Sequence, residues 1–283
     1  MPRSGWTIRE AGQQDRELID EFLGSARWTH QHLDWLGPLD LLDASPFLLA
    51  SSNGSPVACL ACPPDPPEVA WVRLFAVRSD ASPAKLWEEM WPQASLKATA
   101  AGAQRAAAMP TAEWVAPLLS RQGFAPTNAV MFLEWRASLP SDVPHPMAIR
   151  PIQTDDLPAI LEVDNRSFSL LWRYSRPVLQ EALHQSAFGT LFEREGSVVG
   201  YQISTASAFG AHLARLAVLP EFQRQGIGTS LVIDLLQQLA ARGYDRVSVN
   251  TQSDNEHSLR LYRRLGFRET GQRYPVYEKR LEA

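Results

Sequence analysis

The chain has 283 residues, of which 45% are hydrophobic and 20% are charged, and its formal net charge is −4. This length suits two globular domains of roughly 140 residues each, and the hydrophobic fraction is sufficient to fill two cores. The net negative charge argues against nucleic acid or an anionic membrane as the main partner. A phosphate-bearing ligand would therefore need a local binding site.

The composition also bounds location and cysteine chemistry. The N-terminal residues contain no apolar segment followed by a cleavage site, and no stretch approaches the roughly 20 apolar residues that span a bilayer, so we expect a cytoplasmic protein without a membrane partner. Cys59 and Cys62 are the only cysteines and fall in an expected strand, Val57–Cys62. Residues i and i+3 of a strand face opposite sides. We therefore predict two buried thiols and no metal.

The first half of the chain predicts a mixed α/β domain. The segment Trp6–Arg9 leads into a helix pattern around Asp15 and Phe22, and Asn53-Gly54 is typical of a hairpin turn. Hydrophobic periodicity then predicts a strand at Val69–Val77, a helix at Pro83–Ala101, a strand at Arg105–Met109, a helix at Thr111–Arg121 and a strand at Ala129–Trp135.

A linker and a second α/β domain follow. Three prolines in Ala137–Pro146 favour an extended linker, which predicts domains at 1–136 and 147–283. The expected elements of the second domain are strands at Met147–Ile152, Thr190–Arg194, Val198–Ser207, His212–Val218, Arg246–Thr251 and Arg273–Arg280, and helices near Asp155–Val163, Arg176–Gln185, Gly228–Ala241 and Glu256–Leu265.

The two halves resemble each other at both ends. Four early positions correspond without a gap, and they are Ile8, Arg9, Asp15 and Ile19 in the first half and Ile149, Arg150, Asp156 and Ile160 in the second. Near the other end, Leu118 and Gly123-Phe124 match Leu261 and Gly266-Phe267. These matches predict a tandem duplication. Each copy is expected to form a mixed, mostly antiparallel sheet flanked by helices.

One loop of the second half has the composition of an anion-binding site. The strand His212–Val218 is followed by Gln223-Arg224-Gln225-Gly226-Ile227-Gly228-Thr229 and then by the long helix. Closely spaced glycines let successive backbone N–H groups face one point, and a helix N-terminus adds unpaired N–H groups and the positive end of its dipole. Arg224 adds a charge. We interpret this loop as a pyrophosphate site, although glycines before a helix also form simple tight turns.

This region resembles a known family. Leu216–Gly228 is similar to the acetyl-CoA pyrophosphate motif of the GNAT superfamily of N-acetyltransferases, and Asn250–Phe267 resembles that superfamily's second motif. The resemblance covers about residues 147–283 and extends more faintly over 1–136. It implies an enzyme that transfers an acetyl group from acetyl-CoA to a primary amine by direct attack in a ternary complex. The acceptor would be a small molecule or a peptide, and the protein a monomer or homodimer.

The resemblance also implies roles for individual residues in donor binding. The backbone of Leu216, Ala217 and Val218 would pair with the pantetheine amides as an added strand does. The pyrophosphate would be held by Arg224, Gln225, Gly226, Ile227, Gly228 and Thr229. Asn255 would hold the pantetheine arm or cap the following helix, and both interpretations stay open.

Two residues are candidates for proton transfer. Tyr262 would donate a proton to the leaving sulfur, since a phenol with a pKa near 10 is protonated at neutral pH; alone, it would equally suit a helical core. Family members often carry a glutamate base at positions that here hold His212 and Asn250. Asn250 cannot act as a base, whereas His212 can accept a proton or simply face solvent. We therefore name His212 as the candidate base.

The first half lacks the residues that carry this chemistry. Ala112 and Leu119 stand opposite Asn255 and Tyr262, and the loop Arg78–Ala84 has no glycine. Asp80 would repel a phosphate and Pro83 lacks an N–H donor, so we expect a degenerate copy without CoA chemistry. Its many tryptophans are expected to fill its core, with a substrate cleft as the alternative.

The acceptor is less well defined. In Glu162–Arg176, Glu162 and Asp164 could attract a cationic amine while Phe168, Trp172 and Tyr174 line a pocket. An exposed acidic helix face with ordinary core aromatics explains the same residues. A non-catalytic acyl-CoA-binding or sensing protein and an interaction scaffold are the alternatives to the enzyme.

Overall fold

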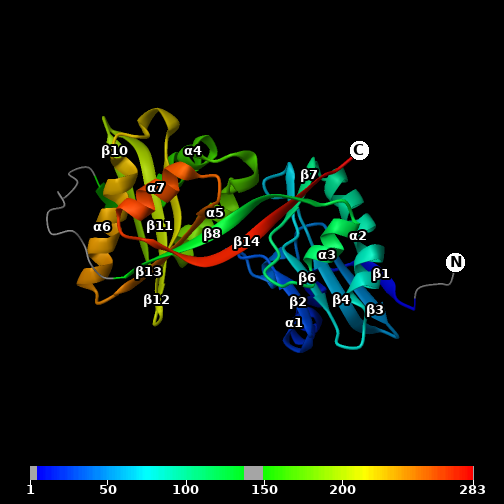
Figure 1. Cartoon of the computed structure of the whole chain (residues 1–283). Coiled ribbons are helices and arrows are strands. Elements are labelled where there is room, and N and C mark those ends of the chain that lie inside the picture. Colours follow the sequence, from blue (N-terminus) through cyan, green and yellow to red (C-terminus); the bar gives the residue numbers. More distant parts are fainter. Residues whose placement is uncertain (1–4, 137–148, 283) are drawn as a thin grey trace. The chain divides into compact units, whose positions relative to one another are not determined.

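The computed structural model describes residues 5–136 and 149–282, and they form two compact units (Figure 1). The first unit is Met1–Thr127 with Tyr274–Ala283, and the second is Asn128–Arg273. The first unit therefore includes a C-terminal strand segment that was expected in the second domain. The second unit includes a segment beginning at Asn128 that was expected in the first domain. The expected linker, Ala137–Pro146, lies outside the described residues.

The first unit contains seven complete strands and three α-helices among its described residues. The strands are β1 (Thr7–Glu10), β2 (Trp28–Gln31), β3 (Phe47–Ser52), β4 (Ser55–Ala61), β5 (Val69–Trp71), β6 (Leu74–Val77) and β7 (Arg105–Ala108), and the helices are α1 (Arg16–Ser25), α2 (Pro83–Ala100) and α3 (Ala116–Arg121). Five strands form a sheet in the order β1-β3-β4-β6-β2. Separately, β7 pairs in parallel with β5 and antiparallel with the end of β14 (Arg268–Arg280).

The second unit has one sheet between two layers of helices. Its strands are β9 (Ile149–Pro151), β10 (Phe188–Arg194), β11 (Ser197–Ser207), β12 (Gly210–Val218) and β13 (Arg246–Gln252), and its helices are α4 (Leu157–Ser167), α5 (Arg176–Gln185), α6 (Ile227–Ala241) and α7 (Glu256–Arg264). With β8 (Ala125–Arg136), the strand order is β8-β13-β12-β11-β10-β9. Neighbouring strands are antiparallel except β12 and β13, which are parallel.

Buried side chains assign the helices to the faces of this sheet. Leu213 of β12 and Val249 of β13 pack in one core cluster with apolar residues of α6 and α7. Arg215 of β12 instead contacts Asp164 of α4. Residues two apart share a face of a regular strand, but an extra residue at Ala214 shifts the alternation between Leu213 and Arg215. α6 and α7 therefore cover one face and α4 covers the other.

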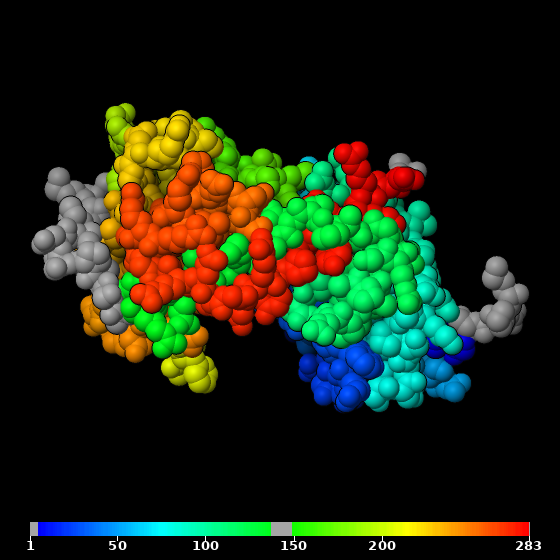
Figure 2. All heavy atoms as spheres, viewed as in Figure 1, coloured from blue at the N-terminus to red at the C-terminus, as the bar shows by residue number. Residues whose placement is uncertain are grey.

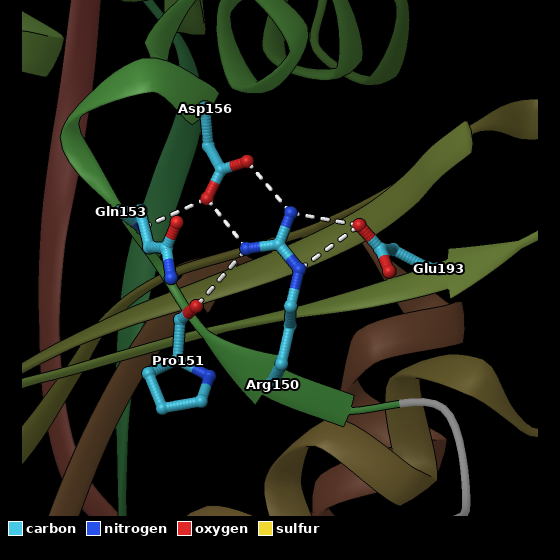
Figure 3. Close-up of polar contacts among 5 residues, drawn as sticks. All are labelled: Arg150, Pro151, Gln153, Asp156 and Glu193. Carbon is cyan, nitrogen blue, oxygen red and sulfur yellow. Dashed lines mark hydrogen bonds and ion pairs between the residues drawn. The ribbon is translucent and has the colours of Figure 1, made fainter. Parts of the chain in front are cut away.

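A repeated ion pair supports the internal duplication. In the second unit the guanidinium of Arg150 donates to both carboxylate oxygens of Asp156, at 2.7 Å each, and the backbone N–H of Gln153 donates to Asp156 at 2.7 Å (Figure 3). In the first unit Arg9 makes the same two-bond contact with Asp15, which also accepts from a backbone N–H, that of Gly12. The residue numbers differ by 141 throughout.

The strand register repeats with the same interval. The parallel pair β5 and β7 places Ala70 opposite Ala106, and the parallel pair β12 and β13 places Ala211 opposite Val247. Both pairs are again separated by 141 residues. The structure therefore contains two copies of one fold, as the matching sequence ends predicted.

Several expected elements of the first half differ from the structure. The expected strand Val69–Val77 is interrupted between β5 and β6, and the expected helix Thr111–Arg121 begins only at Ala116. The strand β2 was not expected. Cys59 and Cys62 are buried as predicted, in separate core clusters, and burial raises the pKa of each thiol to about 12.

The tryptophans of the first unit contribute to its core, as expected. Trp87 and Trp91 are buried and stack with ring centroids 5.2 Å apart, and Phe75 packs edge-on against Trp87. Within residues 5–136 and 149–282, no helix combines the length and apolar character that crossing a membrane requires.

Candidate functional site

The strands β12 and β13 separate after a short parallel contact. They pair only from Ala211 to Leu213 on β12, with Val247 to Val249 on β13. Both strands continue, but within the described residues they no longer pair with each other. On its other side β12 remains paired with β11 as far as Val218. The segment Ala214–Val218 thus presents a strand edge toward the gap, and such an edge can pair with another extended chain.

A β-bulge lies where the gap opens. Ser204 of β11 faces Leu213, whereas the neighbouring Ile203 faces Arg215, so Ala214 is an extra residue on β12. A bulge bends its strand and increases the local twist. The bulge therefore accounts for the divergence of β12 from β13.

The glycine loop at the end of β12 has an unusual backbone conformation. Arg224 and Gly226 have φ values of +61° and +86°, which places both in the left-handed region. Gly226 is the N-cap of α6, and the N–H of Ser230 donates to its carbonyl at 2.9 Å. Alternating right- and left-handed residues turn successive N–H groups toward one point. The expected pyrophosphate residues Arg224–Thr229 thus lie together at the N-terminus of α6.

Side chains fix this loop from several directions. The amide of Gln223 donates to the carbonyl of Val218 at 2.9 Å, and the amide of Gln225 donates to that of Glu221 at 3.1 Å. Arg264 donates to the hydroxyl of Thr229 at 2.9 Å. Arg264 brings a second guanidinium beside the loop. Sequence reasoning did not identify it, because its helix α7 meets α6 only in the folded chain.

Asn255 and Tyr262 both lie on α7. Asn255 caps the helix, since its carbonyl oxygen accepts from the N–H of Ser258 at 3.2 Å. Tyr262 is 3% exposed and packs against Phe267 with ring centroids 5.5 Å apart. Burial raises the pKa of Tyr262 above its ordinary value, so the phenol is protonated at neutral pH. Figure 2 shows the outer side of α7 (orange) at the molecular surface. Arg260 on this helix is exposed.

His212 lies at the closed end of the gap, on the opposite face of the sheet from α7. Its Nδ1 is 2.9 Å from the hydroxyl oxygen of Ser248, and its Nε2 is 3.4 Å from Nδ2 of Asn250. A side-chain amide nitrogen is a donor, so this contact leaves Nε2 unprotonated. Burial lowers the pKa of His212 below 6.5. The imidazole is therefore neutral at pH 7 and can accept a proton.

A cavity of about 370 Å³ adjoins His212. It is formed by the tips of β11 and β12 and the start of β13. Its lining residues are Thr205, Ala206, Ser207, Phe209, Gly210, Ala211, His212, Arg246 and Ser248. Because His212 belongs both to this lining and to the three paired positions of β12, the cavity adjoins the closed end of the gap.

The expected acceptor segment surrounds a cation that belongs to the chain itself. Arg215 lies between the rings of Phe168 and Tyr174, with its guanidinium carbon 3.6 and 3.7 Å from the two centroids. Its Nε donates to the fully buried carboxylate of Asp164 at 2.8 Å, and its Nη2 donates to the carbonyl of Trp172 at 2.7 Å. The hypothesis that Asp164 and these two aromatic rings receive a cationic substrate is therefore wrong, since Arg215 occupies that position.

Comparison with known proteins agrees with this geometry. Residues 156–267 match the model of the acetyltransferase (GNAT) family. This part of the chain is a GNAT acetyltransferase domain. The domain is similar to the ribosomal protein bS18-alanine N-acetyltransferase of Escherichia coli (strain K12), with 28% identity over 138 residues, which are 48% of this chain and 92% of that protein. The chain is accordingly an acetyl-CoA-dependent N-acetyltransferase.

Two solved structures are similar to the whole chain. The GCN5-related N-acetyltransferase from Sphaerobacter thermophilus has a TM-score of 0.61 and 16% identity, with 100% of this GNAT chain and 98% of that chain covered. A tandem GNAT protein from the clavulanic acid biosynthesis pathway has a TM-score of 0.65 and 14% identity, with 98% and 99% covered. These TM-scores show the fold, which is that of two GNAT-like domains in tandem.

Proposed function

We propose that the second unit transfers the acetyl group of acetyl-CoA directly to a primary amine while both substrates are bound. One observation carries this proposal: the open edge Ala214–Val218 leads through a single chain segment to the loop Arg224–Thr229. An open strand edge suits the amides of pantetheine, and a helix N-terminus preceded by a glycine turn suits the pyrophosphate. The two adjacent sites match the two parts of one CoA molecule.

The candidate acid and base lie on opposite faces of the sheet. In the proposed reaction the amine nitrogen attacks the thioester carbonyl carbon, a C–N bond forms and the C–S bond breaks. His212 accepts the proton that the amine loses, and Tyr262 donates its phenolic proton to the departing sulfur. Tyr262 packs in the core cluster on the α7 side of the sheet, and His212 lies on the opposite face, so in this proposal the two residues act from opposite sides of the thioester. Asn255 has a structural explanation as a helix cap, and its contact with pantetheine remains part of the proposal.

Features of the first unit support the proposal that each chain has one donor site, in the second unit. Its strand β6 corresponds to Arg215–Val218 at the interval of 141 residues, and β2 pairs antiparallel along β6, with Trp28 opposite Val77 and Gln31 opposite Leu74. The edge that is open in the second unit is therefore covered in the first by the chain's own strand. In the loop that follows, Arg78 pairs with Asp80. We infer a degenerate copy without CoA chemistry.

Peptide amines belong among the first acceptors to be tested. The name of the Escherichia coli relative describes acetylation of an alanine in a ribosomal protein. A terminal α-amine has a pKa near 7.7–8.0, compared with about 10.4 for a lysine side chain. The α-amine therefore requires less assistance from a weak base such as His212.

The decisive experiment measures release of free thiol from acetyl-CoA with a panel of peptides, polyamines and aminoglycosides. Tyr262→Phe keeps the buried ring and removes only the proton donor, so we expect kcat to fall by roughly 10²-fold while acetyl-CoA binding measured by calorimetry is unchanged. Tyr244→Phe is the matched control, because Tyr244 packs against the same core cluster. Acetyl-CoA binding without thiol release for any acceptor would favour a non-catalytic sensing protein, an alternative motivated by Asn250 at a family glutamate position.

A further inference from the structure

The cavity beside His212 has a lining that discriminates between amines by charge. We infer that it receives the acceptor and selects an amine flanked by neutral or acidic groups, such as the α-amine of an acidic peptide, over polyamines and other polycations. This inference rests on the proposed function and specifies the substrate class of the same site.

The position of the cavity makes it suitable for the acceptor. His212 is part of its lining and is also the middle of the three positions of β12 that pair with β13, two residues before the bulge at Ala214. An amine in the cavity would therefore lie beside the candidate base, with the gap opening on the other side of His212, beyond Leu213. The volume of about 370 Å³ is within the range of small-molecule sites and suits the end of a peptide.

The charge around the cavity is positive. Among the described residues that line it, Arg246 is the one side chain with a full charge. Its carboxylate partner Glu134 also binds Arg136, at 2.6 Å. Two guanidinium groups thus share one carboxylate, so the cluster of Arg136, Arg246 and Glu134 carries one excess positive charge. Arg246 is 48% exposed, so it can contact a ligand without losing this partner.

This arrangement discriminates between two kinds of acceptor. A polyamine brings additional ammonium groups, and the described lining offers them hydroxyl and carbonyl oxygens but no carboxylate. Each such group would experience repulsion from Arg246, whereas a carboxylate near the amine would be attracted. The lowered pKa of His212 acts in the same direction, because a weak base deprotonates an α-amine more readily than an alkyl ammonium group.

The two arginines provide a matched pair of variants. Both Arg246 and Arg136 bind Glu134, but only Arg246 lines the cavity. With the full chain, kcat/KM for acetyl transfer would be measured for Ala-Asp-Ala, Ala-Lys-Ala and spermidine at one pH and low ionic strength. We expect the acidic peptide to exceed the basic peptide at least tenfold, with spermidine lowest. Arg246→Glu should reverse the peptide preference, and Arg136→Glu should retain most of it.

Each result has a defined consequence. Arg246→Gln provides a second test in case Arg246→Glu fails to fold, and it should reduce the preference severalfold while acetyl-CoA binding stays unchanged. A preference for spermidine or Ala-Lys-Ala in the wild type, or equal effects of the Arg246 and Arg136 substitutions, would overturn the inference and leave the proposed function intact. Absence of thiol release with every acceptor would overturn the proposed function and the inference with it.

Discussion

Gly226 and Gly228 are two residues apart in the candidate pyrophosphate loop, but the structure requires each for a different reason. A Cβ atom on Gly226 would meet no atom within 4 Å, so glycine is needed there for its φ of +86°. A Cβ atom on Gly228 would lie 3.2 Å from Cδ1 of Leu261, so glycine there avoids a tight contact between α6 and α7. The first glycine shapes the loop and the second brings two helices together.

This distinction predicts the effect of Gly226→Ala on donor binding. Alanine in the left-handed region costs about 1–2 kcal/mol, so the loop of the unbound variant should leave this conformation. CoA binding must then restore it, at the same cost in binding free energy. We expect the Kd for CoA measured by calorimetry to rise roughly five- to thirtyfold. Gly243→Ala is the control, since Gly243 has a φ of +83° with similarly open space at the far end of α6. An equal rise in Kd for both variants would contradict the assignment of the loop.

His212 predicts the acidic side of the pH–rate profile. As the proposed base it must be neutral, and burial lowers its pKa below 6.5. The enzyme should therefore stay active below pH 6.5 and lose activity only as the pH falls through the depressed pKa. This predicts an acidic limb in kcat at saturating substrates that disappears in His212→Gln, whose residual rate should be lower by roughly 10²-fold. Persistence of the same limb in His212→Gln would exclude this residue as the titrating base.

At the level of secondary structure, Arg215 connects β12 to the segment between α4 and α5. Its guanidinium is buried between two aromatic rings and is neutralised by Asp164, which also accepts from the hydroxyl of Tyr201 and the N–H of Tyr174. A buried pair of this kind contributes little net stability compared with apolar residues, but removal of one partner leaves a charge unpaired. The pair therefore holds the segment in place on the strand proposed to bind the donor.

Asp164→Asn tests this connection. The substitution retains the shape of the side chain and leaves the charge of Arg215 unpaired, so we expect the free energy of unfolding to fall by about 3–5 kcal/mol in chemical denaturation. The control is Glu162→Gln on the same helix, where the side chain is 70% exposed and pairs with Arg166; we expect a change below about 0.5 kcal/mol. A loss below about 1 kcal/mol for Asp164→Asn would show that the pair is not important for stability.

The elements predicted best from the sequence are those specified by local residues. α5 was predicted with its observed bounds and α6 within one residue, because both carry clear apolar periodicity and α6 ends at Arg242-Gly243. β2 was missed because four residues have too short a pattern, and its partner β6 is more than 40 residues away. The acceptor hypothesis around Asp164 failed for a related reason, since Arg215 meets that residue only in the folded chain.

At the level of the whole molecule, the duplication preserved structure and changed function. The ion pair Arg9–Asp15 recurs as Arg150–Asp156, and the register of the central parallel strands is the same in both units. The sequence revealed the duplication through these matched positions. It did not reveal that residues 128–136 pack in the second unit or that residues 274–282 pack in the first. An alternating pattern predicts a strand but does not identify the strand with which it pairs.

The corresponding strand edge is covered in the first unit and open in the second, and this difference predicts the number of CoA molecules that the chain binds. β2 covers the edge in the first unit, while the edge of β12 is open within the described residues, so calorimetric titration should give one CoA per chain. Gly226→Asp should abolish binding, because it places a carboxylate in the glycine loop where the pyrophosphate is proposed to lie. Asp80→Gly removes the carboxylate from the corresponding loop of the first unit, yet the stoichiometry should stay at one because β2 still occupies the edge. Two bound molecules per wild-type chain, or a second site created by Asp80→Gly, would show that the first unit remains able to bind CoA.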